Sequence, residues 1–521
     1  MSLKVVGVVG DQSTPVEIDI KANHPLPSGT YIYVRFKTKD IVRESESIRE
    51  VVGIVGSSMY KAVIPVTMTP TTEVFESYLS DLKKESYMKA LIVADITSRK
   101  PEAPRYPPPP ETPVYLASPE HLRVVYSYDT SKSVRIGTLA GFEELEVGVN
   151  VNALPKHILI AGTTGSGKSN LVAVLADRVA QMGGSVVIFD VHGEYRNMSP
   201  ESSDVIVTTY EASINVVKTP ISLLTSFIIP ERSATRQRRI LRNALKNLNN
   251  ELVSFARANR ISIKEAVRRF VTSKNLWGDS EPVEMYKELL KTRLGTDKVV
   301  EDVKDKIDDF FEWHRVDLET PDVGEVVGNR KVVVVDVSTF RDDEKDYMLK
   351  VVAENLLWFL KEGRIPPTLL VVEEAHLFLR ADKSTWSKEA LQRFIREGRK
   401  FGGMLAIVSQ RPRALDTEVV SQVQNFAFLR LVQKADRTAV TDITDVLGEE
   451  YANILPTLPP GYGVLVGEWV GWYPAYVKVD LHRGKRVGAT PDVVSTWRKA
   501  LEVEEARLRD RESLTKEWEG G

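Results

Sequence analysis

The glycine-rich octapeptide GTTGSGKS, from Gly162 to Ser169, constrains the fold of this chain more than any other feature. It has the spacing GxxxxGK[ST], follows an apolar run from Ile158 to Ala161, and precedes a segment whose apolar residues recur about once per helical turn. In such a strand–loop–helix unit the backbone N–H groups curl around phosphate oxygens at the positive end of the helix. The motif therefore predicts an α/β core that holds a nucleotide phosphate.

Each position in the loop has an expected role. The Lys168 ammonium should reach the outer phosphates of ATP, and the Ser169 hydroxyl can ligate Mg²⁺. The alternative is a chance glycine-rich turn, which the strand before it and the helix after it argue against. The residues predicted to bind the nucleotide are Gly162, Thr163, Thr164, Gly165, Ser166, Gly167, Lys168, Ser169 and Asn170.

Two adjacent acids, Glu373 and Glu374, close the apolar run in PPTLLVVEEAH. Side chains alternate along a strand, so the two acids should have different roles. By position, Glu373 is expected to hold the Mg²⁺ shell and Glu374 to orient and polarise the attacking water. The alternative is a solvated acidic pair at a strand end.

Two further residues are candidates for the same chemistry. Glu194, in FDVHGEY, is a rival for the water-activating role, although Glu374 ranks first. His192 in that motif reads as a turn residue, because no second histidine lies at metal-ligand spacing. Gln410 ends the last apolar run and could sense the γ-phosphate of ATP, or it could simply cap a loop.

The position of Arg399 suggests that a second subunit contributes to the nucleotide site. In RFIREGRKFG, Arg396 and Arg399 are neighbours on one helix face. If that face meets the next subunit's nucleotide, Arg399 could act in trans as an arginine finger. An ordinary basic helix face is the alternative.

Strand-length apolar runs alternate with helical patterns from about residue 150 onward, which predicts a doubly wound parallel sheet. The predicted units are a small β-barrel or sandwich (1–100), a proline-rich linker and lead-in (101–149), the ATPase core (150–212 and 331–480), a helical insertion (213–330) and a C-terminal helical tail (481–521). The predicted core strands are Ile158–Ala161, Val186–Asp190, Val332–Val337, Leu369–Glu373 and Leu405–Val408.

Composition excludes several classes of site. The chain has no cysteine, so disulfides, thiolate zinc sites and a cysteine nucleophile are excluded. No apolar run approaches the length of a membrane span and the N-terminus lacks a signal-peptide pattern, so we expect a cytoplasmic protein with no membrane partner. The formal net charge is −2, so any nucleic-acid site must be local.

These motifs, taken in order, resemble the HerA/FtsK branch of RecA-like motors, and most closely its archaeal HerA members. The resemblance rests on GTTGSGKS, DVHGEY, LLVVEEAH, REGRKFG with SQRP, the N-terminal barrel and the insertion, and covers most of the chain. It implies a RecA-like P-loop ATPase core and a homo-hexamer that threads double-stranded DNA, hydrolyses ATP between subunits, and acts as a helicase or translocase with the nuclease NurA in end resection for recombinational DNA repair.

The resemblance also assigns residues. Lys168, Ser169, Glu374, Gln410 and Arg399 take the family's nucleotide and trans-acting roles by position. The sequence departs from the family in one place, because Glu373 replaces the usual aspartate of the second acidic motif. The division of labour between the two glutamates therefore stays open.

A DNA-translocating ring needs cations that face phosphates without reading bases. The loop LRADKSTWSK offers Arg380, Lys383 and Lys388 for this contact, unless it is an ordinary solvated loop. The competing functions are a ring ATPase that moves protein and a nucleotide-dependent scaffold that hydrolyses slowly.

Overall fold

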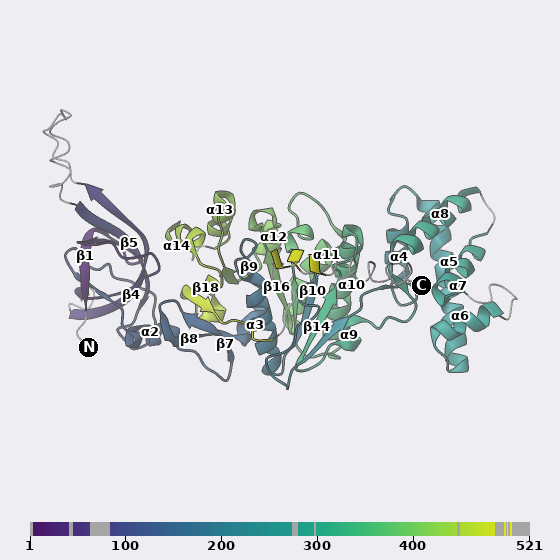
Figure 1. Ribbon diagram of the computed structural model, residues 1–521, viewed down its shortest axis with the longest axis horizontal. Helices are drawn as coiled ribbons and strands as arrows, with labels where there is room; N and C mark the ends of the chain where they lie inside the picture. The colour runs from purple at the N-terminus through teal and green to yellow at the C-terminus, as the bar shows by residue number, and fades with distance from the viewer. Residues whose placement is uncertain are drawn as a thin grey trace, which may run out of the picture.

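The computed structural model describes residues 4–40, 45–62, 84–272, 280–295, 298–444 and 449–484, with 494–495, 497–498 and 501–502 beyond them. Three units stand in a row along the longest axis: a β-barrel that contains the N-terminus, a large sheet with its helices, and a helical bundle (Figure 1).

The N-terminal unit is a closed antiparallel barrel with strand order β1-β2-β5-β4-β3-β6. Alternating side chains such as Ile18 and Ile20 point inward and are fully buried, as expected for strands with one dry face. The strands are β1 Val5–Ser13, β2 Glu17–Ala22, β3 Tyr31–Asp40, β4 Ser45–Ala62, β5 Lys84–Asp95 and β6 Pro113–Leu116.

The barrel extends past the predicted boundary at residue 100. β6 lies after the proline-rich segment and closes the barrel by pairing with both β1 and β3. The proline-rich segment is therefore a crossing within the barrel unit rather than a linker that follows it. The predicted lead-in also contains α2 (Pro119–Tyr126) and two strands of the central sheet, β7 (Ser133–Leu139) and β8 (Phe142–Asn150).

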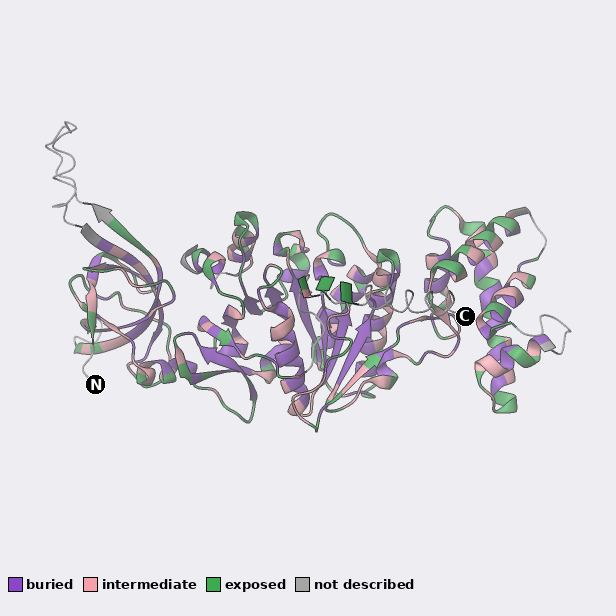
Figure 2. Cartoon of the chain, in the orientation of Figure 1, coloured by how far each residue is buried: buried purple, intermediate pink, exposed green. Residues whose placement is uncertain are grey.

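The central sheet has eleven strands in the order β11-β14-β10-β15-β16-β9-β17-β18-β19-β7-β8. Neighbours from β11 to β17 are parallel, and their core strands are buried along their whole length, which confirms the predicted α/β fold class (Figure 2). The parallel strands are β9 Ile158–Ala161, β10 Ser185–Asp190, β11 Ile206–Tyr210, β14 Lys331–Asp336, β15 Thr368–Val372, β16 Gly403–Ser409 and β17 Asn425–Phe428.

β18 (Tyr462–Gly467) and β19 (Ala475–Val479) form the antiparallel pair predicted after Leu455, and β7 and β8 extend the sheet from there. The remaining helices of the core surround this sheet or its ends. They are α3 Lys168–Gln181, α9 Val323–Val326, α10 Asp342–Lys361, α11 Trp386–Gly398, α12 Thr417–Val420, α13 Lys434–Ile443 and α14 Glu449–Ile454, with short 3-10 turns η1 Val151–Lys156, η2 Ala375–Leu377, η3 Arg399–Phe401, η4 Pro412–Ala414, η5 Leu455–Thr457 and η6 Glu468–Val470.

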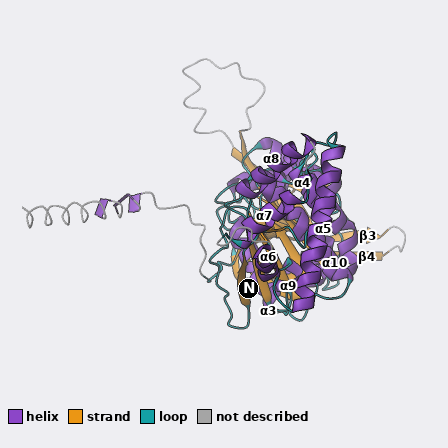
Figure 3. Ribbon diagram, turned by 90° about the vertical axis from the view of Figure 1, so that its right-hand side faces the viewer, coloured by secondary structure: helices purple, strands orange, loops and turns teal. Residues whose placement is uncertain are grey.

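The helical insertion forms the third unit, and its helices face the viewer in Figure 3. Their apolar residues, such as Leu241, Leu245 and Leu248 of α5, recur at helical spacing and are fully buried. The chain enters and leaves the bundle through a two-stranded sheet, β12 (Ile214–Asn215) with β13 (Val316–Asp317). The helices are α4 Ile221–Ile228, α5 Thr235–Asn259, α6 Ile263–Thr272, α7 Pro282–Thr292 and α8 Lys298–Trp313.

Most of the predicted C-terminal tail lies outside the described residues. Within the described part of the chain, no helix combines the length and the hydropathy that a bilayer crossing requires.

Candidate active site

The phosphate loop connects β9 to α3 at the carboxyl end of the strand. Gly165 and Gly167 have φ angles of 73° and 107°, in the left-handed region that favours glycine. A Cβ at Gly162 would lie 2.6 Å from Ser166 Oγ, so the loop folds back tightly on itself. The Ser166 hydroxyl is buried and has no hydrogen-bond partner among the described residues. This geometry fits a loop that receives phosphate oxygens.

Lys168 begins α3 and is buried among acids. Its ammonium donates to the Thr163 carbonyl at 3.1 Å. Burial lowers the lysine pKa, while the charges of Glu374, Glu373 and Glu194 oppose that shift. Three acids from two separate segments thus lie around one cation, because β9, β15 and β10 all end at the same edge of the sheet.

A continuous hydrogen-bond chain joins the loop to Glu374 through Gln410. The Thr164 hydroxyl donates to Gln410 Oε1 at 2.6 Å, and Gln410 Nε2 donates to Glu374 Oε1. Gln410 follows the carboxyl end of β16, the strand between β9 and β15. The amide therefore occupies the position from which it can link phosphate-loop contacts to the acid.

Glu374 stands at a backbone turn rather than on a strand. β15 ends at Val372, and Glu374 has a φ of 47° in the left-handed region. The two glutamates therefore separate because the chain turns, which corrects the expectation from strand alternation. The Glu374 carboxylate is buried, with His376 Nδ1 3.2 Å from Oε2 and His192 Nε2 3.7 Å from Oε1.

Glu373 is buried and contacts the segment that follows β10. The Tyr195 hydroxyl donates to its Oε1. Burial raises the Glu373 pKa to about 8, partly offset by this hydrogen bond. Asp190 fixes the turn that carries Tyr195: its Oδ1 accepts the Gly193 N–H at 2.8 Å and its Oδ2 accepts the Tyr195 N–H at 2.8 Å.

Glu194 remains a candidate for the water-activating acid. It belongs to the same Asp190-organised turn, and its backbone N–H donates to Asp190 Oδ1 at 3.1 Å. Its charge raises the pKa values of Lys168 and Glu373, so its carboxylate is near both. His192, in that turn, donates its N–H to Asp190 and is exposed, in keeping with a turn residue.

The side chains of Ser169 and Asn170 have different surroundings. Ser169 is half-buried in the first turn of α3, next to Lys168. The Asn170 amide donates to the Asp480 carbonyl at 2.8 Å and accepts from the His482 N–H at 3.0 Å. The Asn170 side chain therefore anchors the segment after β19, and its predicted nucleotide contact would have to come from its backbone N–H.

Arg399 lies at the opposite edge of the sheet. It precedes β16, whereas Gln410 follows that strand, and a seven-residue strand separates its ends by about 20 Å. Arg399 is exposed, and its guanidinium has no hydrogen bond or ion pair with any residue that the structure describes. It cannot reach the phosphate loop of its own chain.

The three cations predicted to contact DNA have different surroundings. Arg380 is exposed but forms two hydrogen bonds with Asp382, at 2.8 and 2.6 Å. Lys383 is exposed and forms no ion pair within the described ranges. The Lys388 ammonium donates to the Arg380 carbonyl and pairs with Asp416 at 2.7 Å, which argues against a phosphate contact.

The sequence interpretation missed two residues of this site, Tyr195 and His376. Tyr195 closes FDVHGEY and is buried against Glu373, and His376 follows the two acids directly. Their positions inside recognised motifs were the available signal, but only the turns at Asp190 and Glu374 bring them to the carboxylates.

Comparison with known proteins gives a consistent set of similarities. The family model described as the central domain of helicase HerA matches residues 134–356. The chain is 32% identical over 515 residues to the DNA double-strand break repair helicase HerA of Saccharolobus solfataricus, covering 96% of this chain and 97% of that protein. It is 36% identical over 425 residues to the protein of the same name from Sulfurisphaera tokodaii, covering 80% and 82% respectively.

Solved structures show more distant similarity. VirB4 of Thermoanaerobacter pseudethanolicus aligns with a TM-score of 0.46 at 16% identity, covering 69% of this chain and 99% of that one. The plasmid coupling protein TrwB in complex with ADP and Mg²⁺ aligns with a TM-score of 0.43 at 15% identity, covering 72% and 94%.

Proposed function

This chain belongs to the HerA helicase family, and from that membership we propose that it is an ATP-driven motor that moves on double-stranded DNA during repair of double-strand breaks. The observation that carries the proposal is the hydrogen-bond chain from Thr164 through Gln410 to Glu374. It connects the loop that receives the phosphates to the acid that can activate water, as a hydrolysing site requires.

The residues support the following hydrolysis. Glu374 orients a water molecule and accepts its proton as the water oxygen attacks the γ-phosphorus of ATP. The bond to the bridging oxygen breaks, leaving ADP and inorganic phosphate. Lys168 stabilises the negative charge of the outer phosphates. Gln410 changes partner when the γ-phosphate leaves, which makes it a sensor of the nucleotide state.

Mg²⁺ fits the oxygen donors of the site. The Ser169 hydroxyl and the Glu373 carboxyl would hold it, and the ion would neutralise phosphate charge as it does in related sites. The raised pKa of Glu373 and its hydrogen bond from Tyr195 favour a protonated carboxyl in the nucleotide-free chain. Glu373 therefore has to release a proton to become a direct ligand, or else it acts through a water molecule.

We further propose that the active form is a ring, taken as a hexamer from the resemblance, in which Arg399 reaches the nucleotide of the neighbouring subunit. Two observations support this: the arginine is exposed without a hydrogen-bond or ion-pair partner among the described residues, and a whole strand length separates it from its own phosphate loop. Partnership with a NurA-type nuclease in end resection follows from the resemblance alone and belongs to this proposal.

DNA contact is proposed at Arg380 and Lys383. Both line a cavity of about 970 Å³ between the helical insertion and the core. Its lining carries more cationic than acidic side chains, which suits a sugar–phosphate backbone. The cationic residues of the lining are Arg232, Arg238, Arg341, Lys345, Lys350, Arg380 and Lys383, and the acidic ones are Asp342, Asp343, Asp346 and Glu389.

The test is ATP hydrolysis by the purified chain with and without linear duplex DNA, with Lys168→Ala as the blank. Stimulation by DNA that the variant lacks supports a DNA-coupled motor. Hydrolysis that neither DNA nor an added nuclease partner stimulates would point to a motor that moves protein. No hydrolysis above the blank would leave a nucleotide-dependent scaffold.

A further inference from the structure

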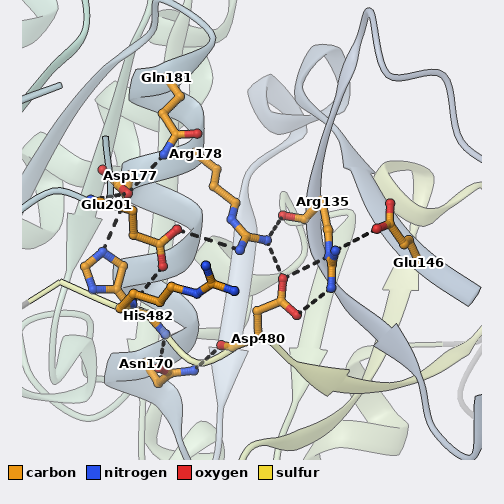
Figure 4. Close-up of polar contacts among 10 residues, drawn as sticks. Arg135, Glu146, Asn170, Asp177, Arg178, Gln181, Glu201, Asp480 and His482 are labelled. Atoms are coloured by element: carbon orange, nitrogen blue, oxygen red, sulfur yellow. Dashed lines mark hydrogen bonds and ion pairs between the residues drawn. The ribbon is translucent and has the colours of Figure 1, made fainter. Parts of the chain in front are cut away.

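Behind the phosphate loop, three potential metal ligands from distant segments meet. Asp177 lies in the second half of α3, Glu201 in the connection from β10 to β11, and His482 just after β19. One ligand atom from each residue lies within 4.8 Å of the others. Figure 4 shows the His482 ring beside the two carboxylates.

Two of these side chains are buried and carry polar atoms that have no hydrogen-bond partner among the described residues. The side chains of Asp177 and His482 are both 0% exposed. Both ring nitrogens of His482 and Asp177 Oδ1 have no hydrogen-bond partner among the described residues. Buried polar atoms of this kind are rare in native proteins, and a bound ion is one standard explanation.

The neighbouring hydrogen bonds hold the carboxylates in place but leave ligand atoms available. Asp177 Oδ2 accepts from Gln181 Nε2 at 3.1 Å and from the Glu201 N–H at 3.0 Å, whereas Oδ1 accepts nothing. Glu201 Oε1 accepts the Arg483 N–H at 2.8 Å. Such outer contacts orient the ligands of metal sites.

A direct ion pair between His482 and Asp177 explains the geometry less well. His482 Nε2 is 3.7 Å from Asp177 Oδ2, too far for a hydrogen bond. A protonated imidazole would also bury two N–H donors without acceptors. Two ligand atoms of one tetrahedral Zn²⁺ lie about 3.3 to 3.6 Å apart, so the three ligand atoms here, which lie within 4.8 Å of one another, would approach somewhat closer around an ion.

From this cluster we infer a further site: Asp177, Glu201 and His482 bind one divalent transition-metal ion, with Zn²⁺ as the best fit. An imidazole with two carboxylates favours such an ion over Mg²⁺ or Ca²⁺, which take oxygen ligands. Two carboxylates offset its charge, and Glu201 also pairs with the Arg178 guanidinium, 3.8 Å from its Oε2.

The ion would join the phosphate-loop helix to the segment after β19. Asn170 already bonds the backbone of Asp480 and His482, and Arg178 pairs with Asp480 at 2.7 Å. Gly484 lets the chain pass close over the ring, since a Cβ there would lie 2.5 Å from His482 Cε1. The ion would thus cross-link the second half of α3 to the segment after β19, away from the catalytic residues.

The experiment uses untagged full-length protein, stripped with a chelator and returned to buffer with excess Mg²⁺ and ADP, so that the nucleotide site is occupied. Co²⁺ serves as a spectroscopic probe and Zn²⁺ as the competitor. We expect about one Co²⁺ per chain, with the visible absorption of a low-coordinate site, and displacement by Zn²⁺. Saturating Zn²⁺ should raise the melting temperature by about 5 °C.

Four variants locate the ion. His482→Gln and Asp177→Asn should each lose the Co²⁺ band and the Zn²⁺ stabilisation. His376→Gln tests the other histidine–carboxylate cluster, beside Glu374, and His314→Gln tests a buried histidine 3.7 Å from one carboxylate, Glu344. Both should keep one Co²⁺.

Three results would overturn the inference: no Co²⁺ band in the wild-type chain, a band that survives in His482→Gln, or a band that disappears only in His376→Gln. If His482→Gln does not fold, Asp177→Asn and the wild-type stoichiometry decide the question. None of these readouts depends on ATP hydrolysis or DNA, so the site can fail while the proposed function holds.

Discussion

At the carboxyl edge of the central sheet, Lys168, Glu373 and Glu374 are buried; Glu373 accepts a hydrogen bond from Tyr195, and Glu374 accepts one from Gln410. At the amino edge, Arg399 is exposed, and within the described part of the chain its guanidinium has no hydrogen bond or ion pair. Both edges belong to the same strands, yet the candidate groups at the carboxyl edge are hydrogen-bonded within the chain, whereas the Arg399 guanidinium at the amino edge has no such bond to a described residue.

The contrast shows that one chain can position the phosphates and the attacking water by itself, whereas the proposed arginine contact requires a second subunit. Buried, hydrogen-bonded groups hold their geometry before a ligand arrives, which is what positioning of phosphate and water requires. An exposed arginine without a partner contributes nothing until another surface arrives. We therefore expect changes at the carboxyl edge to act within a subunit and changes at the amino edge to act between subunits.

The largest expected effect is at the amino edge. Arg399→Ala should lower kcat about 10³-fold, since a trans-acting arginine contributes about 10³ to 10⁵ in rate. Arg396→Ala is the matched control, because that arginine lies in the last turn of α11, which ends just before Arg399, but pairs with Glu418, and it should change kcat less than twofold.

Mixing two inactive proteins, Arg399→Ala and Lys168→Ala, sharpens the comparison. Some interfaces in mixed rings combine an intact phosphate loop with an intact arginine, so activity should partly return. If the mixture stays inactive, or if Arg399→Ala alone is fully active, the amino edge has no catalytic role between subunits.

The next effect separates the two candidate acids at the carboxyl edge. Glu374→Gln should lower kcat about 10²-fold while ATP still binds, because a general base is lost. Glu194→Gln should lower it less than tenfold. Single-turnover hydrolysis with a parallel nucleotide-binding measurement checks both, and the opposite ranking would transfer the water-activating role to Glu194.

A smaller effect tests the exposed cations near the insertion. Lys383→Ala should weaken duplex DNA binding uniformly across sequences and reduce the slope of log K against log salt by about 1. Lys388→Ala should leave the slope unchanged, because its ammonium is held by Asp416 and the Arg380 carbonyl. Equal slopes for wild type and Lys383→Ala would remove that lysine from the DNA path.

The smallest expected effect is a pH dependence of stability at the carboxyl edge. The folded-state pKa of Glu373 is raised to about 8 from 4.5, so the folded chain binds the extra proton in that window. Stability from this group is complete below pH 4.5 and declines as pH rises toward 8. Thermal unfolding of nucleotide-free protein in chelator should show a steeper decline for wild type than for Glu373→Gln, and identical slopes would contradict the raised pKa.

Several elements could be predicted because their cause is local. Apolar runs of strand length predicted β9, β10, β14, β15 and β16 to within a few residues, and the fold class followed from their alternation with helices. Met182 shares the helical spacing of Leu171 and Leu175 but is 43% exposed, because α3 ends one residue earlier. Apolar spacing predicts which side chains share the buried face of a helix only for residues that lie within that helix.

Other features depended on long-range pairing. β6 closes the barrel by pairing with β1 and β3 across the proline-rich segment, so no local pattern reveals where that unit ends. β11 is an edge strand, so it is short and partly exposed and lacks a continuous apolar run. The sequence interpretation therefore omitted it.

By itself the sequence determined the nucleotide chemistry, since a glycine loop between a strand and a helix has few other uses and its residues are contiguous. Only the tertiary structure decided which distant side chains meet: Tyr195 with Glu373, Gln410 with both the loop and Glu374, and His482 with Asp177. The physical reason is that the order of strands in a sheet sets these neighbours, and that order follows from packing of the whole chain rather than from any one segment.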